Sequence, residues 1–99
     1  MRIISIKTLK NFWENVKYRD SEQSLASWCR EIKKDKWKCP NDIKDKYGTA
    51  SIIGNNRVVF NIKGNKYRIV VRINYRISSI FIRFIGTHEE YNKINSKEI

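Results

Sequence analysis

Apolar residues in the first part of the chain recur at helical spacing. One helix is predicted with Thr8 as its N-cap and an apolar stripe at Leu9, Phe12, Trp13 and Val16. A second helix is predicted to begin at Asp20, with Gln23 in the capping-box position, and its apolar residues follow at i, i+3, i+4 and i+7: Leu25, Trp28, Cys29 and Ile32. A short apolar stretch, residues 2–6, precedes both helices, which are expected to form a hairpin with one apolar seam.

The middle of the chain is a connector, and the pattern changes after it. The basic run at residues 33–38 and then Pro40 end the second helix, and Pro40 can start a short helical turn ahead of Gly48. From Ser51 onward, β-branched or aromatic runs alternate with turn signals, and the runs lie at residues 52–53, 58–62, 67–73 and 80–85. This spacing predicts a twisted antiparallel sheet of about four strands.

A final short helix is predicted directly after the last strand. Thr87 can cap it, and Glu90 occupies the reciprocal third position of a capping box. His88 and Tyr91 then lie one turn apart on one side of the helix, next to the end of the last strand. Helices collected before the sheet, with one short helix after it, indicate an α+β fold in a single domain over residues 1–99.

Charge is distributed unevenly along the chain. The formal net charge of +11, from 21 Lys and Arg against 10 Asp and Glu, favours polyanionic partners such as RNA and the ribosome. No Asp or Glu lies between Ala50 and His88, where the basic residues are Arg57, Lys63, Lys66, Arg68, Arg72, Arg76 and Arg83. The alternative is that these charges only protect strand edges and keep the protein in solution.

The alternation along residues 67–73 assigns the two faces of the predicted sheet. Tyr67 and Ile69 share the face that is expected to pack on the helices. Arg68 and Arg72 share the opposite face with Asn74. The charged face is therefore expected to carry the function.

Composition also argues against membrane, disulfide and metal roles. No apolar run approaches the roughly 18 residues of a spanning helix, and residues 1–9 lack the order of a signal peptide, so we expect a cytoplasmic protein with no membrane partner. Cys29 and Cys39 are expected to be reduced thiols. These cysteines and His88 show no zinc-binding spacing, so neither a metal nor another cofactor is expected.

RNA cleavage needs few protein groups when the 2′-hydroxyl of the substrate is the nucleophile. Arg68 can hold the scissile phosphate through two donors. His88, the only histidine, is the natural candidate for proton transfer near neutral pH, and Tyr91 can be the partner acid or stack on a base. The RNA backbone is expected to be attracted by four further residues: Arg57, Lys66, Arg72 and Arg83.

Each candidate catalytic residue also has a structural alternative. His88 can be a surface or capping residue, and Tyr91 can anchor the terminal helix on the sheet. Arg68 can pair with Glu89 or Glu90. At the level of function, the alternatives are a non-catalytic RNA-binding or ribosome-associated module, which needs the basic sheet but not His88, and a protein-interaction domain that meets an acidic partner.

Two stretches of the chain carry a recognisable motif. Residues 59–70 form a strand, a Gly-Asn turn and a strand that opens with Tyr-Arg, and residues 84–91 contain Gly-Thr-His-x-x-Tyr. In both stretches the chain resembles the HigB-type toxins of type II toxin–antitoxin systems, which are RelE-like mRNA interferases. Residues 3–13 also resemble the first strand and helix of the family.

The resemblance implies a RelE-like fold and metal-independent mRNA cleavage coupled to translation in the ribosomal A site. It also implies inhibition by a cognate HigA-like helix-turn-helix antitoxin, so that DNA is contacted only through the antitoxin complex. Carried over by position, the Arg, His and Tyr of the family motifs are Arg68, His88 and Tyr91.

One departure from the family pattern lies beside the terminal tyrosine. Related RelE-like toxins often have more basic residues there, whereas this chain has Glu89 and Glu90. The candidate substitutes for that positive charge are Arg83, Lys66 and Lys93.

Overall fold

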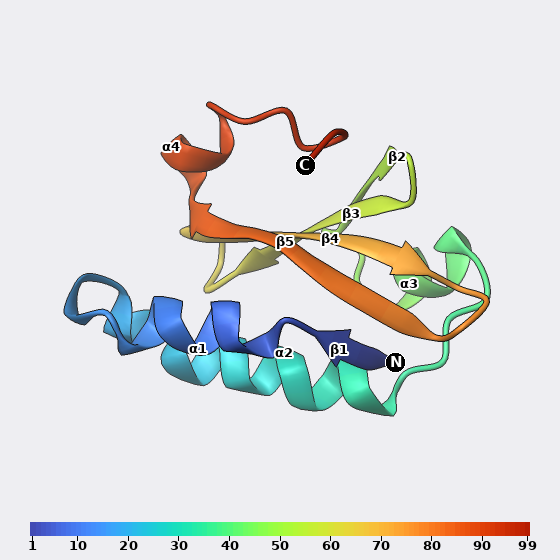
Figure 1. Ribbon diagram of the computed structural model, residues 1–99, viewed down its shortest axis with the longest axis horizontal. Coiled ribbons are helices and arrows are strands. Elements are labelled where there is room, and N and C mark those ends of the chain that lie inside the picture. The colour runs from blue at the N-terminus through green and yellow to red at the C-terminus, as the bar shows by residue number, and fades with distance from the viewer.

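Helices occupy the first half of the chain and strands most of the second half. The computed structural model describes residues 1–99 (Figure 1). Its elements are β1 (Arg2–Ile4), α1 (Ile6–Glu14), the 3₁₀ helix η1 (Val16–Ser21), α2 (Glu22–Lys34), α3 (Pro40–Lys46), β2 (Ser51–Gly54), β3 (Arg57–Ile62), β4 (Tyr67–Asn74), β5 (Ser79–Thr87) and α4 (His88–Tyr91). The α+β class, the short helix at Pro40 and the short C-terminal helix agree with the prediction.

The sheet has five strands rather than about four, and it is mixed rather than antiparallel. The strand order is β1-β5-β4-β3-β2, and β1 is parallel to β5, with Ile3 opposite Ile80. The other three pairs of neighbouring strands are antiparallel. The resemblance implied a first strand, but β1 was not predicted as part of the sheet, because it pairs with a segment far away along the chain and no local turn signal marks such a pair.

The beginnings of the first two helices differ from the predicted ones. Helix α1 begins at Ile6, because Ser5 adopts a left-handed backbone (φ 71°) that turns the chain out of β1, and Thr8 lies inside the helix. Helix α2 begins at Glu22, and Asp20 lies in η1. Asp20 does not cap α2, because its carboxylate accepts hydrogen bonds from Lys66 and Tyr67 instead. The predicted caps at Thr8 and Asp20 were wrong.

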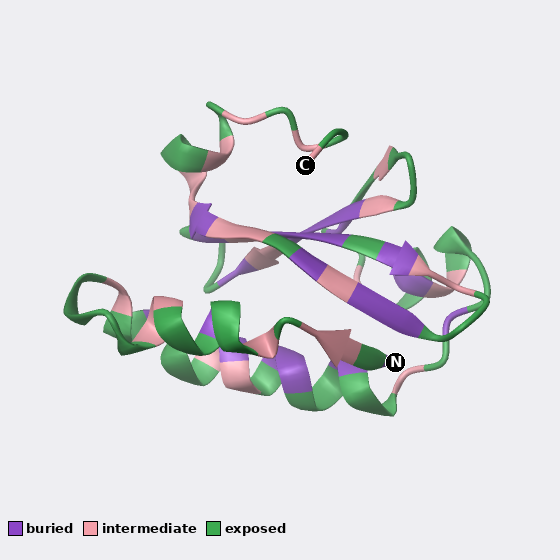
Figure 2. Ribbon diagram, viewed as in Figure 1, coloured by how far each residue is buried: buried purple, intermediate pink, exposed green.

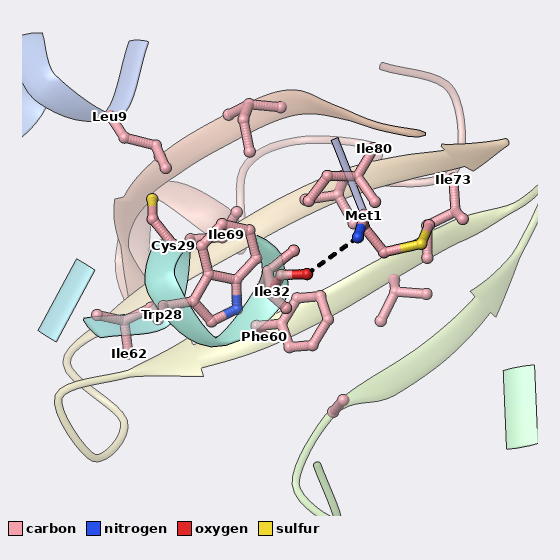
Figure 3. Close-up of a cluster of buried hydrophobic side chains, with 14 of the residues drawn as sticks. Met1, Leu9, Trp28, Cys29, Ile32, Phe60, Ile62, Ile69, Ile73 and Ile80 are labelled. Atoms are coloured by element: carbon pink, nitrogen blue, oxygen red, sulfur yellow. Dashed lines mark hydrogen bonds between the residues drawn. The ribbon is translucent and has the colours of Figure 1, made fainter. Parts of the chain in front are cut away.

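Helices α1 and α2 lie along one face of the sheet, with η1 between them (Figure 1). The core fills the space between these helices and the sheet, and Figure 2 shows buried residues along the strands opposite exposed outer helix faces. Leu9, Leu25 and Ile32 of the helices and Ile69 of β4 are fully buried there. Figure 3 shows this packing around Phe60, with the Met1 amino group donating to the Ile32 carbonyl oxygen at 3.3 Å.

The opposite face of the sheet, here called the outer face, carries α4 and the segment that follows it (Figure 1). Val59 and Val70, which pair across β3 and β4, are buried outside the main core cluster. A bulge lies in the β4–β5 pair, where Val70 is opposite Phe84 but Val71 is opposite Ile82, so Arg83 is the extra residue. The bulge keeps apolar residues directed to the core on both sides of it.

The segment after α4 returns over the outer face to the beginning of β3. The main-chain oxygen of Ile99 accepts from Nε and Nη2 of Arg57 at 3.2 and 2.6 Å. The side-chain amide of Asn55 donates to the Lys97 carbonyl oxygen at 3.4 Å. The segment after α4 therefore covers part of the outer face, next to the beginning of β3.

Candidate functional site

Arg68 and Tyr91 meet where β4 begins and β5 ends. Arg68 is opposite Gly86 in the β4–β5 pair, and the next pair is Tyr67 with Thr87. The guanidinium carbon of Arg68 lies 4.8 Å from the centre of the Tyr91 ring, so the cation stacks over the aromatic face. Two of the three predicted catalytic residues are therefore in direct contact.

His88 begins α4 beside this pair. Its backbone N–H donates to the Lys66 carbonyl oxygen at 3.3 Å, which extends the β4–β5 ladder by one step into the helix. Its ring atom Nδ1 lies 3.2 Å from Nδ2 of Asn92, and the ring makes no other protein hydrogen bond. The imidazole is half-buried and has one nitrogen available for a ligand.

The charge of Arg68 is not neutralised by a carboxylate. Its Nη2 donates to Oδ1 of Asn65 at 3.2 Å, and its Nε is buried without a protein partner. The alternative in which Arg68 pairs with Glu89 or Glu90 is wrong, because the ion pairs of the structure include neither carboxylate. A guanidinium that has no carboxylate partner, and whose Nη1 makes no protein hydrogen bond, is suited to bind an anionic oxygen.

The predicted capping box at the start of α4 is confirmed. The Thr87 hydroxyl accepts from the Glu90 N–H at 3.2 Å, and Oε1 of Glu90 accepts from the Thr87 N–H at 2.9 Å. Glu90 is thereby held against the backbone rather than against Arg68. The cap also fixes the direction in which the single turn of α4 leaves the sheet.

Tyr91 has a structural contact as well as its stacking on Arg68. Its ring centre lies 6.5 Å from that of Phe84 on β5, and its hydroxyl lies 3.4 Å from the hydroxyl of Ser96. Phe84 in turn covers Gly86, where an added Cβ would come within 2.6 Å of the Phe84 ring. The alternative role of Tyr91 as an anchor for α4 is therefore compatible with its place in the site.

Lys66 is less free than the sequence suggested. It forms an ion pair with Asp20, whose carboxylate also accepts from the Tyr67 hydroxyl at 2.5 Å and lies 3.7 Å from Nζ of Lys63. The hydrogen bonds from Lys66 and Tyr67 lower the pKa of Asp20 to about 2, and the same contact raises the pKa of Lys66. Asp20 thus connects the helical layer to the turn that precedes Arg68. The sequence pattern singled out Asp20 only as the start of a helix and did not predict this contact.

The remaining predicted RNA-binding residues are spread over the outer face. Arg57 and Arg72 are direct partners on β3 and β4, and Arg72 lies over the Phe81 ring at 5.1 Å. Arg83 is exposed at the bulge, and Lys93 is exposed just after α4. Sequence reasoning missed Asn61, the β3 partner of Arg68, and Asn65, its hydrogen-bond partner, because neutral amides carry no charge signal.

Cys29 is buried and Cys39 is exposed, and both are free thiols, as predicted. Burial raises the pKa of the Cys29 thiol. Nowhere do three or more His, Cys, Asp or Glu side chains gather as metal ligands would. None of the helices is both long enough and apolar enough to cross a membrane.

Comparison with known proteins identifies the family. The HigB toxin family, described as the RelE-like toxic component of a toxin–antitoxin system, matches residues 21–94. The chain belongs to the HigB toxin family. The matched residues run from the end of η1 past α4 and include the whole of the Arg68, His88 and Tyr91 site.

Three curated relatives of the HigB family are similar over most of their length. The chain is 29% identical over 94 residues to the mRNA interferase toxin HigB of Escherichia coli (strain K12). These 94 residues cover 93% of this chain and 88% of the relative. The mRNA interferases HigB of Escherichia coli O157:H7 and of Shigella flexneri are similar to the same extent. The sequence resemblance to HigB-type toxins is therefore confirmed.

Proposed function

We propose that this HigB-family protein is an mRNA interferase toxin, a metal-independent endoribonuclease that cleaves mRNA and thereby inhibits translation and growth. The observation that carries the proposal is the unneutralised Arg68 guanidinium, stacked on Tyr91 beside His88. The names of the curated relatives give the same activity.

The reaction uses the 2′-hydroxyl of the substrate. A base removes its proton, the 2′-oxygen attacks the adjacent phosphorus, and a pentavalent phosphorane forms. The bond from phosphorus to the 5′-oxygen then breaks, and that oxygen takes up a proton. The products are a 2′,3′-cyclic phosphate and a 5′-hydroxyl end, so atoms and charge balance without a water molecule or a cofactor.

Three side chains divide this work. The Nη donors of Arg68 bind the phosphate oxygens as their negative charge increases in the phosphorane. His88 moves protons through its free ring nitrogen. Tyr91 orients the substrate by stacking and keeps the Arg68 guanidinium in place.

The rest of the RNA follows the outer face. It contacts the basic residues Arg57, Lys66, Arg72, Arg83 and Lys93. Lys66 contributes its charge from within the ion pair with Asp20, since more than half of its side chain remains exposed. The strength of this contact comes from the release of counterions from the RNA backbone.

The partners follow from the same proposal. The single toxin domain over residues 1–99 acts in the cytoplasm on mRNA in the ribosomal A site, and it is neutralised by a cognate HigA-like helix-turn-helix antitoxin. DNA is reached only through the antitoxin complex. The family match to a toxin–antitoxin component supports the antitoxin partner.

Substitution of the site tests the activity. Arg68→Ala and His88→Ala are each expected to lower the rate of RNA cleavage by about 10²–10³-fold, because each removes one stabilising or proton-transferring group. Arg30→Ala, on the exposed face of α2, is the control of equal charge. New mRNA 5′ ends are mapped after induction, together with growth. If both site variants cut RNA and arrest growth as the parent does, the protein acts as a non-catalytic RNA-binding module or through other residues.

A further inference from the structure

A cavity of about 380 Å³ opens at the end of the outer face farthest from α4 along β4. It is formed where the β2–β3 turn meets the end of β4 and the β4–β5 turn. Its lining includes Asn56, Arg57, Arg72, Asn74 and Arg76. The volume is that of a small-ligand site, and the lining is polar and basic.

No carboxylate lines this cavity, although three arginines do. Arg57 and Arg72 are directly opposite each other on β3 and β4. Like charges in this position are unfavourable, and no Asp or Glu side chain pairs with either arginine. A bound anion removes that repulsion, so the arrangement favours an anionic ligand.

The free donors of the cavity point to the same ligand. The guanidinium groups of Arg72 and Arg76 make no hydrogen bond within the protein, and Arg72 is positioned only by its stacking on Phe81. Asn74 uses its side-chain oxygen to accept from the Ile77 N–H at 3.4 Å, which leaves its amide donors free. These groups donate hydrogen bonds and none of them carries negative charge.

Arg57 already binds an oxygen at the rim of the cavity. Its Nε and Nη2 hold the Ile99 main-chain oxygen in a two-pronged contact, and its Nη1 donates to the Asn55 carbonyl oxygen at 2.8 Å. This geometry is the one by which arginine binds phosphate oxygens. A phosphate oxygen at the rim would therefore take the place of the Ile99 oxygen on Arg57.

We propose that this cavity is a second phosphate subsite, which binds the RNA backbone about two to four nucleotides away from the phosphate at Arg68. Arg68 and Arg72 lie on the same face of β4, four residues apart, which separates the two subsites by roughly 13 Å along the strand. The proposal rests on the proposed function, since RNA is the polyanion. It adds that the toxin binds its substrate at two fixed points.

Length-dependent binding tests the subsite. The ligands are fluorescent single-stranded RNAs of about 2 nucleotides, too short to reach both subsites, and of about 12 nucleotides, within the usual range of single-strand site sizes. They carry 2′-O-methyl groups, which block the nucleophile and prevent cleavage. Fluorescence anisotropy gives the dissociation constant at several salt concentrations for the parent, for Arg76→Gln and for Lys10→Gln, a control on α1 beneath the opposite face of the sheet.

The parent is expected to bind the longer RNA more tightly, and Arg76→Gln is expected to remove about three- to ten-fold of that difference. The slope of log affinity against log salt should become shallower by about 0.7, the value for one lost phosphate contact. If Arg76→Gln and Lys10→Gln give equal effects, or if binding does not depend on length, the subsite is overturned.

Cleavage of unmodified mRNA on translating ribosomes separates this result from the proposed function. A parent that cuts RNA while the cavity variant behaves like the control disproves the subsite alone. A parent that cuts no RNA disproves the proposed activity, while a selective loss in Arg76→Gln then still establishes the cavity as an RNA-binding site. Thermal melting of each variant confirms that the exposed turn tolerates the change.

Discussion

Asp20 is the residue that joins the helical layer to the turn before Arg68. Its carboxylate binds both Lys66 and Tyr67, and the carbonyl oxygen of Lys66 accepts from the His88 N–H. One carboxylate thus supports the chain on both sides of the site. Because the Asp20 carboxylate accepts these hydrogen bonds, it does not cap α2.

Replacing Asp20 is expected to remove part of the acid sensitivity of the fold. The pKa of Asp20 is lowered from 3.8 to about 2 by the Lys66 and Tyr67 hydrogen bonds, so its contribution to stability is present above the unfolded pKa and is lost as pH falls from about 4 to about 2. Asp20→Asn should therefore lower the melting temperature at pH 7 and flatten its decline over that acidic range.

The control for this experiment is Asp45→Asn, since Asp45 is exposed on α3 and makes no ion pair. Melting curves from pH 7 to pH 2 are compared for the parent and both variants. Equal pH dependence in the parent and in Asp20→Asn would show that Asp20 does not stabilise the folded state.

At this scale, sequence reasoning found the charged residues but not their partners. Arg68 and Tyr91 were grouped from strand alternation and helix spacing, both of which are local, and their contact is confirmed. The ion pair between Asp20 and Lys66 joins residues 46 positions apart, and charge patterns along the chain do not specify such pairs. Lys66 was therefore taken as freer than it is.

Helix α4 is a single turn and needs support from its surroundings. A helix of this length is not stable by itself. The capping box of Thr87 and Glu90 holds its first turn, and the Phe84 ring packs over Gly86 directly before it. The positions of His88 and Tyr91 thus depend on a capping box whose residues, Thr87 and Glu90, take no part in the proposed reaction.

Removal of the Thr87 hydroxyl is expected to loosen this element. Thr87→Ala should destabilise the start of α4 by about 1 kcal/mol, whereas Thr87→Ser keeps the cap. Hydrogen exchange at the Glu90 amide, which donates to Thr87, reports the loss directly. RNA cleavage should fall in the alanine variant and recover in the serine variant; equal activity in both would show that the cap does not position the site.

Elements that depend on neighbouring residues were the most predictable. The capping box of α4 spans Thr87 to Glu90 and was recognised from four consecutive residues. Strand β1 was missed as a member of the sheet because its partner is the beginning of β5, at the other end of the chain. The N-cap positions of α1 and α2, Ser5 and Ser21, were missed because strand pairing and side-chain contacts elsewhere decide where each helix begins.

Across the whole molecule, negative charge is absent from the strands of the sheet. The first 49 residues mix both signs, whereas the strands β2–β5 contain no acidic residue. The fold places Arg57, Arg68 and Arg72 of these strands on the face opposite α1 and α2. The sequence predicted this asymmetry correctly, because strand alternation alone assigns the face.

Binding to RNA is therefore expected to weaken steeply with salt. Three phosphate contacts, one for each of these arginines, give a slope of log affinity against log salt of about −2. Anisotropy measurements between about 50 and about 200 mM salt determine the slope. Affinity that is unchanged over this range would indicate that the outer face meets its partner through uncharged contacts.

The contact between Arg57 and the Ile99 main-chain oxygen makes RNA binding an exchange reaction. The segment after α4 is a tethered competitor, present at an effective concentration fixed by the short length of chain that connects it to β5. An incoming phosphate must displace it, so the measured affinity is the intrinsic affinity reduced by the population in which this competitor is bound. A substitution that weakens the contact between this segment and Arg57 would therefore raise the affinity for RNA without adding any contact between the protein and the RNA.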